Sequence, residues 1–174
     1  MIIAVDKVRP YITTDLTDEV LEAKLQALEL SIRGYTNNNF QVRGIRTECP
    51  AMNQKLYSSY QYFKVGDTVQ ISESNFNNGI YVITNIVDGF FELDRALIDE
   101  SAVLATKVEY PIDVVMGVIN MLKWDIENRD KVGIQSETIS RHSVTYFNMD
   151  GDNSIMGYPK SLLGFLRVYK RARF

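Results

Sequence analysis

The sequence predicts an α+β protein, in which a small helical bundle carries an inserted small β-barrel and ends in a flexible C-terminal arm. Apolar residues recur at helical spacing over 17–35 and again over about 111–129. Between these stretches, over 47–109, apolar and polar residues alternate between turn residues, as they do in short strands. We therefore expect residues 1–46 and 110–174 to form the bundle, and residues 47–109 to form a self-contained insertion.

Capping residues and apolar spacing predict the two helices. Thr17 precedes two acidic residues, as an N-cap does, and asparagines at 37–39 end the first helix. Pro111 stands where the second helix begins, because a proline in a first turn loses no hydrogen bond. The second helix is apolar on more than one side, so we expect it to pack against the first helix and against a further surface. Val114, Val118 and Met121 widen its apolar stripe, and a strand is expected over 144–147.

Short alternating segments and turn signals predict the inserted barrel. Strands are expected after Gly66-Asp67, over 80–87, after Asp88-Gly89 and near 103–108. Asn77-Asn78-Gly79 and Asp88-Gly89 both have the composition of hairpin turns. Four or five strands in about 50 residues fit a small closed sheet of the SH3-like type.

The charge is distributed unevenly along the chain. The net charge is −3, but residues 160–174 carry five lysines and arginines and no acidic residue, which leaves −8 on residues 1–159. An acidic body argues against a general nucleic-acid binder, because affinity for phosphate backbones requires a cationic surface. A basic segment that ends in an aromatic residue indicates docking on a partner.

The end of the chain supplies the candidate binding residues. A mobile loop is expected over 148–157, followed by a short helix that Pro159 opens. An alternative for 162–166 is a terminal helix whose apolar side joins the core of the protein. The candidate partner-binding residues are Tyr158, Lys160, Leu162, Leu163, Phe165, Leu166, Arg167, Tyr169, Lys170, Arg171, Arg173 and Phe174.

The residue types that carry catalysis or bind metals are scarce. Cys49 and His142 are the only cysteine and the only histidine, so a disulfide framework and a Cys/His zinc cluster are excluded. The run 150–153 looks like a calcium loop, but Ser161 stands where an EF-hand has its bidentate glutamate. No glycine-rich loop precedes a helix. We therefore predict that the protein is not an enzyme and has no cofactor and no metal.

The N-terminus and the apolar runs bear on location. The apolar N-terminal run ends at Asp6 and is too short for a signal-peptide core. No apolar run approaches the roughly 20 residues that cross a bilayer. We therefore expect a soluble protein made in a reducing compartment.

Three stretches, in this order and spacing, resemble one protein family. They are Val8-Arg9-Pro10-Tyr11-Ile12 with the helix that starts Asp18-Glu19-Val20-Leu21; Gly133-Ile134-Gln135-Ser136-Glu137-Thr138-Ile139-Ser140 followed by Ser143-Val144-Thr145-Tyr146; and Tyr158-Pro159-Lys160-Ser161-Leu162-Leu163 through Lys170-Arg171-Ala172-Arg173-Phe174. Together they resemble the head–tail connector (adaptor) proteins of long-tailed double-stranded DNA phages, over residues 1–40 and 110–174. The β-rich 47–109 departs from the compact members of that family, which have a short connection there.

The resemblance implies a structural role in the virion, at the neck, after assembly in the host cytoplasm. Such adaptors form a ring of about a dozen subunits beneath the portal protein, by a head-to-tail contact that closes on itself. The candidate residues for that subunit interface are Val114, Val118, Met121, Val144 and Tyr146. The ring carries the stopper or tail-completion protein, and DNA passes through it without sequence-specific binding. The basic C-terminal arm is expected to clasp the portal.

Two alternatives remain open. The first alternative is a related neck or tail-completion protein of the phage, which would belong to an adjacent ring. A nucleic-acid-binding module that uses the basic tail and the barrel is the other alternative, and its binding would weaken steeply with salt.

Overall fold

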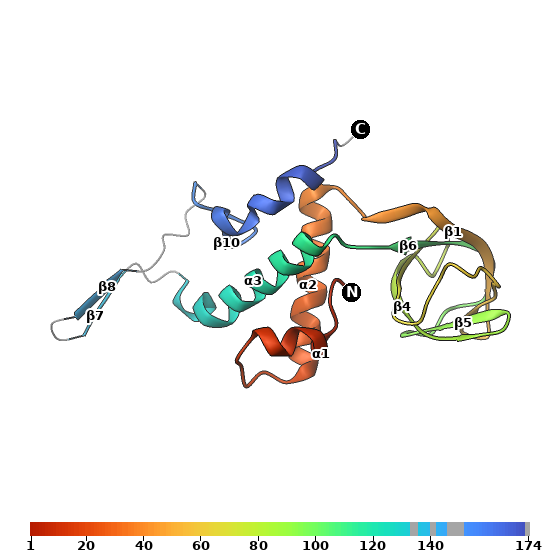
Figure 1. Cartoon of the computed structure of the whole chain (residues 1–174), viewed down its shortest axis with the longest axis horizontal. Coiled ribbons are helices and arrows are strands. Elements are labelled where there is room, and N and C mark those ends of the chain that lie inside the picture. Colours follow the sequence, from red (N-terminus) through yellow and green to blue (C-terminus); the bar gives the residue numbers. More distant parts are fainter. Residues whose placement is uncertain (133–135, 140–141, 146–151, 173–174) are drawn as a thin grey trace. The chain divides into compact units, whose positions relative to one another are not determined.

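The computed structural model describes residues 1–132, 136–139, 142–145 and 152–172 (Figure 1). The chain divides into two compact units. The barrel unit consists of Met1 with Asn38–Tyr110, and the helical unit of Ile2–Asn37 with Pro111–Phe174. Both helices and antiparallel strands are present, which confirms the α+β class.

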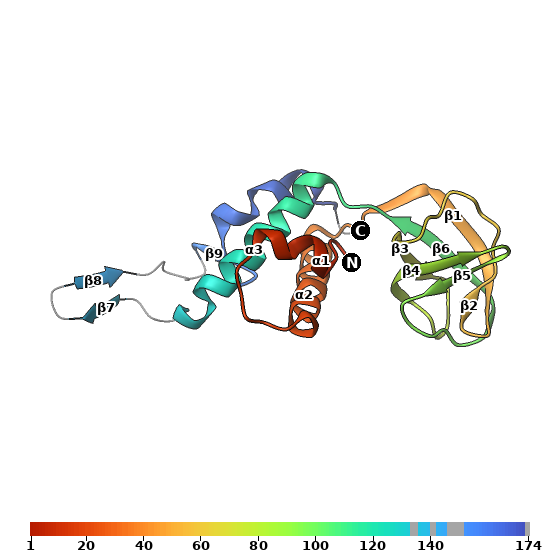
Figure 2. The ribbon, with the colours of Figure 1, turned by 60° about the horizontal axis from the view of Figure 1, so that its bottom comes forward.

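The barrel unit is a closed antiparallel barrel of six strands in the order β1-β2-β5-β4-β3-β6, whose curvature is plain in Figure 2. Its interior is apolar, and the largest fully buried side chains include Leu56, Ile71 and Ile83. Buried and less buried residues alternate over residues 69–72 of β3 and 103–105 of β6, as one buried face requires. The strands are β1 (Gln41–Met52), β2 (Lys55–Leu56), β3 (Thr68–Ser72), β4 (Gly79–Val87), β5 (Phe90–Leu93) and β6 (Glu100–Val108).

The start of this unit differs from the sequence prediction. The boundary lies between residues 37 and 38 rather than between 46 and 47. Residues 41–46, expected in the bundle, form the first half of β1, and Gln41 and Arg46 pair with β6 across an irregularity in register. Alternation is weak there because most of these side chains are exposed or only half-buried.

The turns of the barrel were predicted in part. Asp88-Gly89 joins β4 to β5 as a two-residue hairpin turn, and Gly89 has the positive φ (88°) that favours glycine. Asn77-Asn78-Gly79 is not a tight turn, because β3 and β4 are joined by the longer loop 73–78. Sequence analysis missed the turn between β1 and β2, where Asn53 and Gln54 both have positive φ (50° and 64°). Two such residues match the twist of a hairpin.

Both predicted helices of the helical unit are confirmed as α2 (Asp18–Thr36) and α3 (Ile112–Asn128). The Thr17 side chain accepts a hydrogen bond from the Val20 amide at 3.5 Å, and Asn37 ends α2 in the left-handed conformation. Pro111 is the N-cap residue of α3, one residue before the helix begins. The smaller elements are α1 (Val5–Val8), η1 (Arg9–Tyr11), η2 (Arg129–Lys131), β7 (Ser136–Ile139), β8 (His142–Thr145), β9 (Ser154–Ile155), β10 (Tyr158–Pro159) and η3 (Lys160–Tyr169).

Two of the short hairpins correct the sequence analysis. The strand expected over 144–147 is β8, and it pairs with β7, which was not predicted. Part of the loop expected over 148–157 is the hairpin of β9 and β10, which turns at Met156 and Gly157 with positive φ. Residues 146–151 lie outside the described residues.

The core of the helical unit lies between α2, α3 and η3. Leucines along one side of α2 meet the apolar side of α3, and η3 (blue in Figure 1) runs alongside α3. Gly117 on α3 permits this approach, because a Cβ atom there would lie 2.1 Å from Cζ of Phe165 on η3. Among the described residues, no helix has both the length and the apolar character needed to cross a membrane.

Candidate functional site

The predicted binding segment separates into a packed part and an exposed part. Tyr158, Leu163 and Leu166 are buried in the helical unit, so these side chains do not face a partner. The alternative for 162–166, that its apolar side joins the core, is the one the structure supports. Leu162, Phe165 and Tyr169 are partly buried; Lys160, Arg167, Lys170 and Arg171 are exposed; and Arg173 and Phe174 lie outside the described residues.

Two aromatic side chains, four residues apart, hold η3 against α3. The ring of Phe165 occupies the space above Gly117. The Tyr169 hydroxyl donates to the Asp113 carboxylate, at 2.7 Å from Oδ1 and 2.9 Å from Oδ2. This hydrogen bond raises the pKa of Tyr169 above its usual value, because it stabilises the protonated phenol. Residues 160–169 therefore belong to the fold of the helical unit rather than to an arm.

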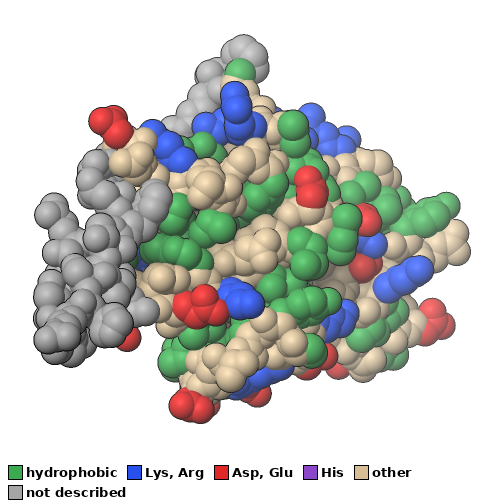
Figure 3. All heavy atoms as spheres, turned by 60° about the vertical axis from the view of Figure 1, so that its left-hand side comes forward, with side chains coloured by type: hydrophobic (Ala, Val, Ile, Leu, Met, Phe, Trp, Pro, Cys, Tyr) green, Lys and Arg blue, Asp and Glu red, His purple; other side chains and the backbone are tan. Residues whose placement is uncertain are grey.

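The residues after η3 are attached to the C-terminal end of α2. Lys170 Nζ lies 3.9 Å from the centre of the Tyr35 ring, and the Arg171 amide donates to the Thr36 carbonyl at 2.8 Å. The Asn37 amide group donates to the Ala172 carbonyl at 3.0 Å. Cations at this end of a helix are favoured by its dipole. In Figure 3, lysine and arginine side chains gather along the upper edge of the displayed face, beside apolar side chains.

The predicted subunit interface on α3 is wrong. Val114, Val118 and Met121 are all fully buried within their own unit, so they cannot meet a neighbouring subunit. The apolar side chains that α3 leaves exposed are Ile112 and Met116. The side chains of Val144 and Tyr146 lie outside the described residues.

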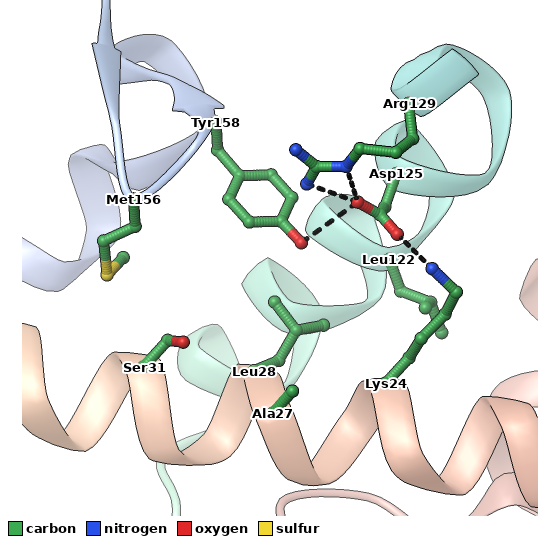
Figure 4. A pocket seen from close by; sticks show the side chains of 9 residues that line it. All are labelled: Lys24, Ala27, Leu28, Ser31, Leu122, Asp125, Arg129, Met156 and Tyr158. Carbon is green, nitrogen blue, oxygen red and sulfur yellow. Dashed lines mark hydrogen bonds and ion pairs between the residues drawn. The ribbon is translucent and has the colours of Figure 1, made fainter. Parts of the chain in front are cut away.

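A buried acidic group that sequence analysis missed lies between α2, α3 and β10 (Figure 4). Asp125 Oδ2 lies 2.6 Å from Lys24 Nζ, and Asp125 Oδ1 lies 2.5 Å from Arg129 Nε. The Tyr158 hydroxyl lies 3.4 Å from the same Oδ1. The spacing of four between Asp125 and Arg129 was readable in the sequence, but Lys24 is 101 residues away from Asp125.

The electrostatics of this cluster indicate a structural role. Burial by itself raises the pKa of the Asp125 carboxyl, but hydrogen bonds and charge from Lys24 and Arg129 outweigh burial and lower it. Burial raises the pKa of Tyr158, so its hydroxyl stays protonated. A carboxylate held between two cations is a poor proton acceptor. A hollow of about 390 Å³ adjoins the cluster, and its walls include Leu28, Leu122 and Met156.

The Cys49 thiol on β1 is held in its protonated form. Burial, and then the neighbouring Glu48 carboxylate, raise the pKa of the Cys49 thiol to about 11. A protonated thiol is a weak nucleophile. Within the described part of the chain, no group of three or more His, Cys, Asp or Glu side chains is placed to hold a metal ion.

The chain matches no protein-family model, and no curated protein sequence matches it. The function is therefore inferred from the residues and contacts described above.

Proposed function

We propose that the chain is a structural virion protein, a head–tail connector (adaptor) that forms a ring beneath the portal and links the DNA-filled head to the stopper or tail. In this proposal, residues 170–174 dock on the portal, rather than the whole of residues 158–174 as the sequence alone indicated. Residues 158–169 pack against α2 and α3 and position the start of that segment at the end of α2.

The exposed basic end is the observation that carries this proposal. Residues 153–172 contain no acidic residue, and Lys170 and Arg171 are exposed although the backbone beside them is anchored. A basic, exposed segment is complementary in charge to an acidic surface on a protein partner. Because its backbone is already anchored, the segment loses less conformational entropy when it binds. Arg173 and the aromatic Phe174 continue the segment.

The charge of the barrel unit supports passage of DNA rather than binding to it. Residues 38–110 contain nine acidic and six basic residues. A surface with this excess of acid repels phosphate backbones. The nucleic-acid alternative therefore depends on the C-terminal segment alone.

A capture experiment with purified proteins tests the proposal. The tagged full-length chain and a chain that ends at Tyr169 are each mixed with the portal protein encoded in the same genome. Truncation after Tyr169 leaves Leu163 and Leu166 in the core. We expect the portal to be captured by the full-length chain only, and capture to fall in Lys170→Ala/Arg171→Ala.

The control variant is Lys7→Ala/Lys123→Ala, which removes two exposed cations elsewhere in the helical unit and should capture normally. Equal capture by the truncated chain would move the docking surface elsewhere, and no capture by either chain would contradict the connector proposal. Binding of a DNA duplex that falls by orders of magnitude between about 50 and 200 mM salt would favour the nucleic-acid module.

A further inference from the structure

The hollow beside the Asp125 cluster has the size of a binding site. Its walls come from α2, α3 and the hairpin of β9 and β10, all of which belong to the helical unit (Figure 4). Its volume of about 390 Å³ falls within the range of roughly 300–1,000 Å³ that is usual for small-ligand sites. Such sites combine apolar walls with a few polar groups that point to one place, and the hollow has both.

The apolar walls of the hollow come from three elements. Leu28 on α2 and Leu122 on α3 are buried, and Met156 at the turn of the hairpin is partly buried. Ala27 and Ser31, one turn apart on α2, also line the hollow and are exposed, so the hollow is open to solvent on this side. An apolar group that enters there loses contact with water, which favours its binding.

The polar part of the hollow carries an excess of positive charge. Lys24 and Arg129 both line it, and no carboxylate other than Asp125 does so among the described residues. The side chains of Lys24 and Arg129 are 34% and 39% exposed, whereas that of Asp125 is only 7% exposed. A lysine ammonium has three N–H donors, and Lys24 uses one of them for Asp125. Lys24 can therefore donate to a second acceptor in the hollow.

Contacts on several sides hold the second cation, Arg129, in place. Its guanidinium carbon lies 5.4 Å from the centre of the Trp124 ring and 5.0 Å from the centre of the Tyr158 ring. Its Nη1 donates to the Gly157 carbonyl at 3.2 Å, in addition to the bond from Nε to Asp125. Because these contacts fix the side chain before any ligand arrives, little conformational entropy remains to be lost on binding.

We infer that this hollow is a binding site for an apolar group that carries a carboxylate. The apolar part packs against Leu28, Leu122 and Met156, and the carboxylate accepts a hydrogen bond from Lys24. The excess positive charge attracts an anion and repels a cation. A free aliphatic or aromatic acid has this chemistry, and so does an acidic side chain beside an apolar one on a protein partner. The site goes beyond the proposed function and includes none of residues 170–174.

Tryptophan fluorescence of the full-length chain reports binding in the hollow. Trp124 is the only tryptophan, and its ring centre lies 5.5 Å from that of Tyr158, which lines the hollow. The chain is titrated at pH 7 with 3-phenylpropionate, with the neutral 3-phenylpropionamide and with the cationic 3-phenylpropylamine. We expect a saturable change with the carboxylate, which should bind about tenfold or more tightly than the amide. The amine should not bind.

Three substitutions on α2 locate the site. Ala27→Leu fills the hollow from an exposed helix position, where leucine is also a good helix former, so this variant should fold but not bind the carboxylate. Ala23→Leu is the matched control, because Ala23 is exposed one turn earlier and does not line the hollow. Lys24→Met should reduce the affinity for the carboxylate to that for the amide. Unchanged binding of the amide to that variant shows that the hollow is intact.

The outcomes separate this inference from the proposed function. The inference is overturned if 3-phenylpropionate does not bind saturably, if the amide binds equally well, or if binding survives Ala27→Leu. Portal capture by the two leucine variants distinguishes the sources of the carboxylate. Loss of capture in Ala27→Leu but not in Ala23→Leu identifies a segment of the portal, whereas equal capture by both favours a free acid. Failure of the native chain to capture the portal contradicts the connector proposal and leaves this site standing.

Discussion

Substituting Gly117 by alanine should loosen the packing of η3 on α3. A Cβ atom at this position would lie 2.1, 2.3 and 2.6 Å from three ring carbons of Phe165. Carbon atoms in contact are normally about 3.5–4.0 Å apart, so the ring must retreat by more than about 1 Å. Overpacking of this kind costs about 1–3 kcal/mol. Alanine in a helix interior contributes about 1 kcal/mol in the opposite direction, so we expect a net loss of about 0–2 kcal/mol.

Tryptophan fluorescence gives an assay for the helical unit alone. The chain has one tryptophan, Trp124 on α3, whose ring centre lies 5.5 Å from that of Tyr158. Urea unfolding followed at Trp124 should show a lower midpoint for Gly117→Ala than for the native chain. Gly34 on α2 is the matched control, because an added Cβ there meets nothing within 4 Å. Gly34→Ala should raise the free energy of unfolding by about 0.5–1 kcal/mol.

A double substitution isolates the clash from the change in helix propensity. In a Phe165→Ala background the ring is gone, so Gly117→Ala should no longer destabilise and should stabilise as Gly34→Ala does. If Gly117→Ala stabilises the native chain as much as Gly34→Ala does, the packing of Phe165 on Gly117 is refuted.

Three further predictions concern hydrogen bonds and pH. Asp125→Asn should lower the unfolding free energy at pH 7 by about 1–3 kcal/mol. Because the folded-state pKa of Asp125 is lowered, its stabilisation is full above about pH 4 and is lost as the pH falls through the lowered pKa. The unfolding free energy of the variant, measured by chemical denaturation at a series of pH values, should therefore lack this fall at acid pH. Tyr169→Phe should cost about 0.5–1.5 kcal/mol at neutral pH; since hydrogen bonding to Asp113 raises the Tyr169 pKa, the difference should vanish as the pH rises through that pKa. Asn77→Ala leaves the Ile98 amide and carbonyl without their side-chain partner, so barrel amides should exchange hydrogen at least tenfold faster, and unchanged exchange would contradict the role of Asn77.

Local signals in the sequence determined the main elements. Thr17 and Asn37 bound α2, and Asp88-Gly89 makes a two-residue turn, because caps and tight turns depend on the backbone preferences of a few neighbouring residues. The first hairpin was missed for the same kind of reason. Asn53-Gln54 is a weak turn signal without glycine, and β1 is too exposed to alternate clearly.

Only the tertiary structure decided which surfaces are covered. Spacing showed that Val118 and Leu166 lie on apolar helix faces, but their burial within one unit depends on residues distant in the sequence. The Lys24–Asp125 pair joins side chains that are 101 residues apart, and no local pattern marks it. The basic character of the C-terminal end was readable from composition, whereas its attachment to α2 depends on where Tyr35 and Thr36 lie after folding. Short-range preferences thus determine where elements begin and end, and long-range packing determines which of their faces remain free for a partner.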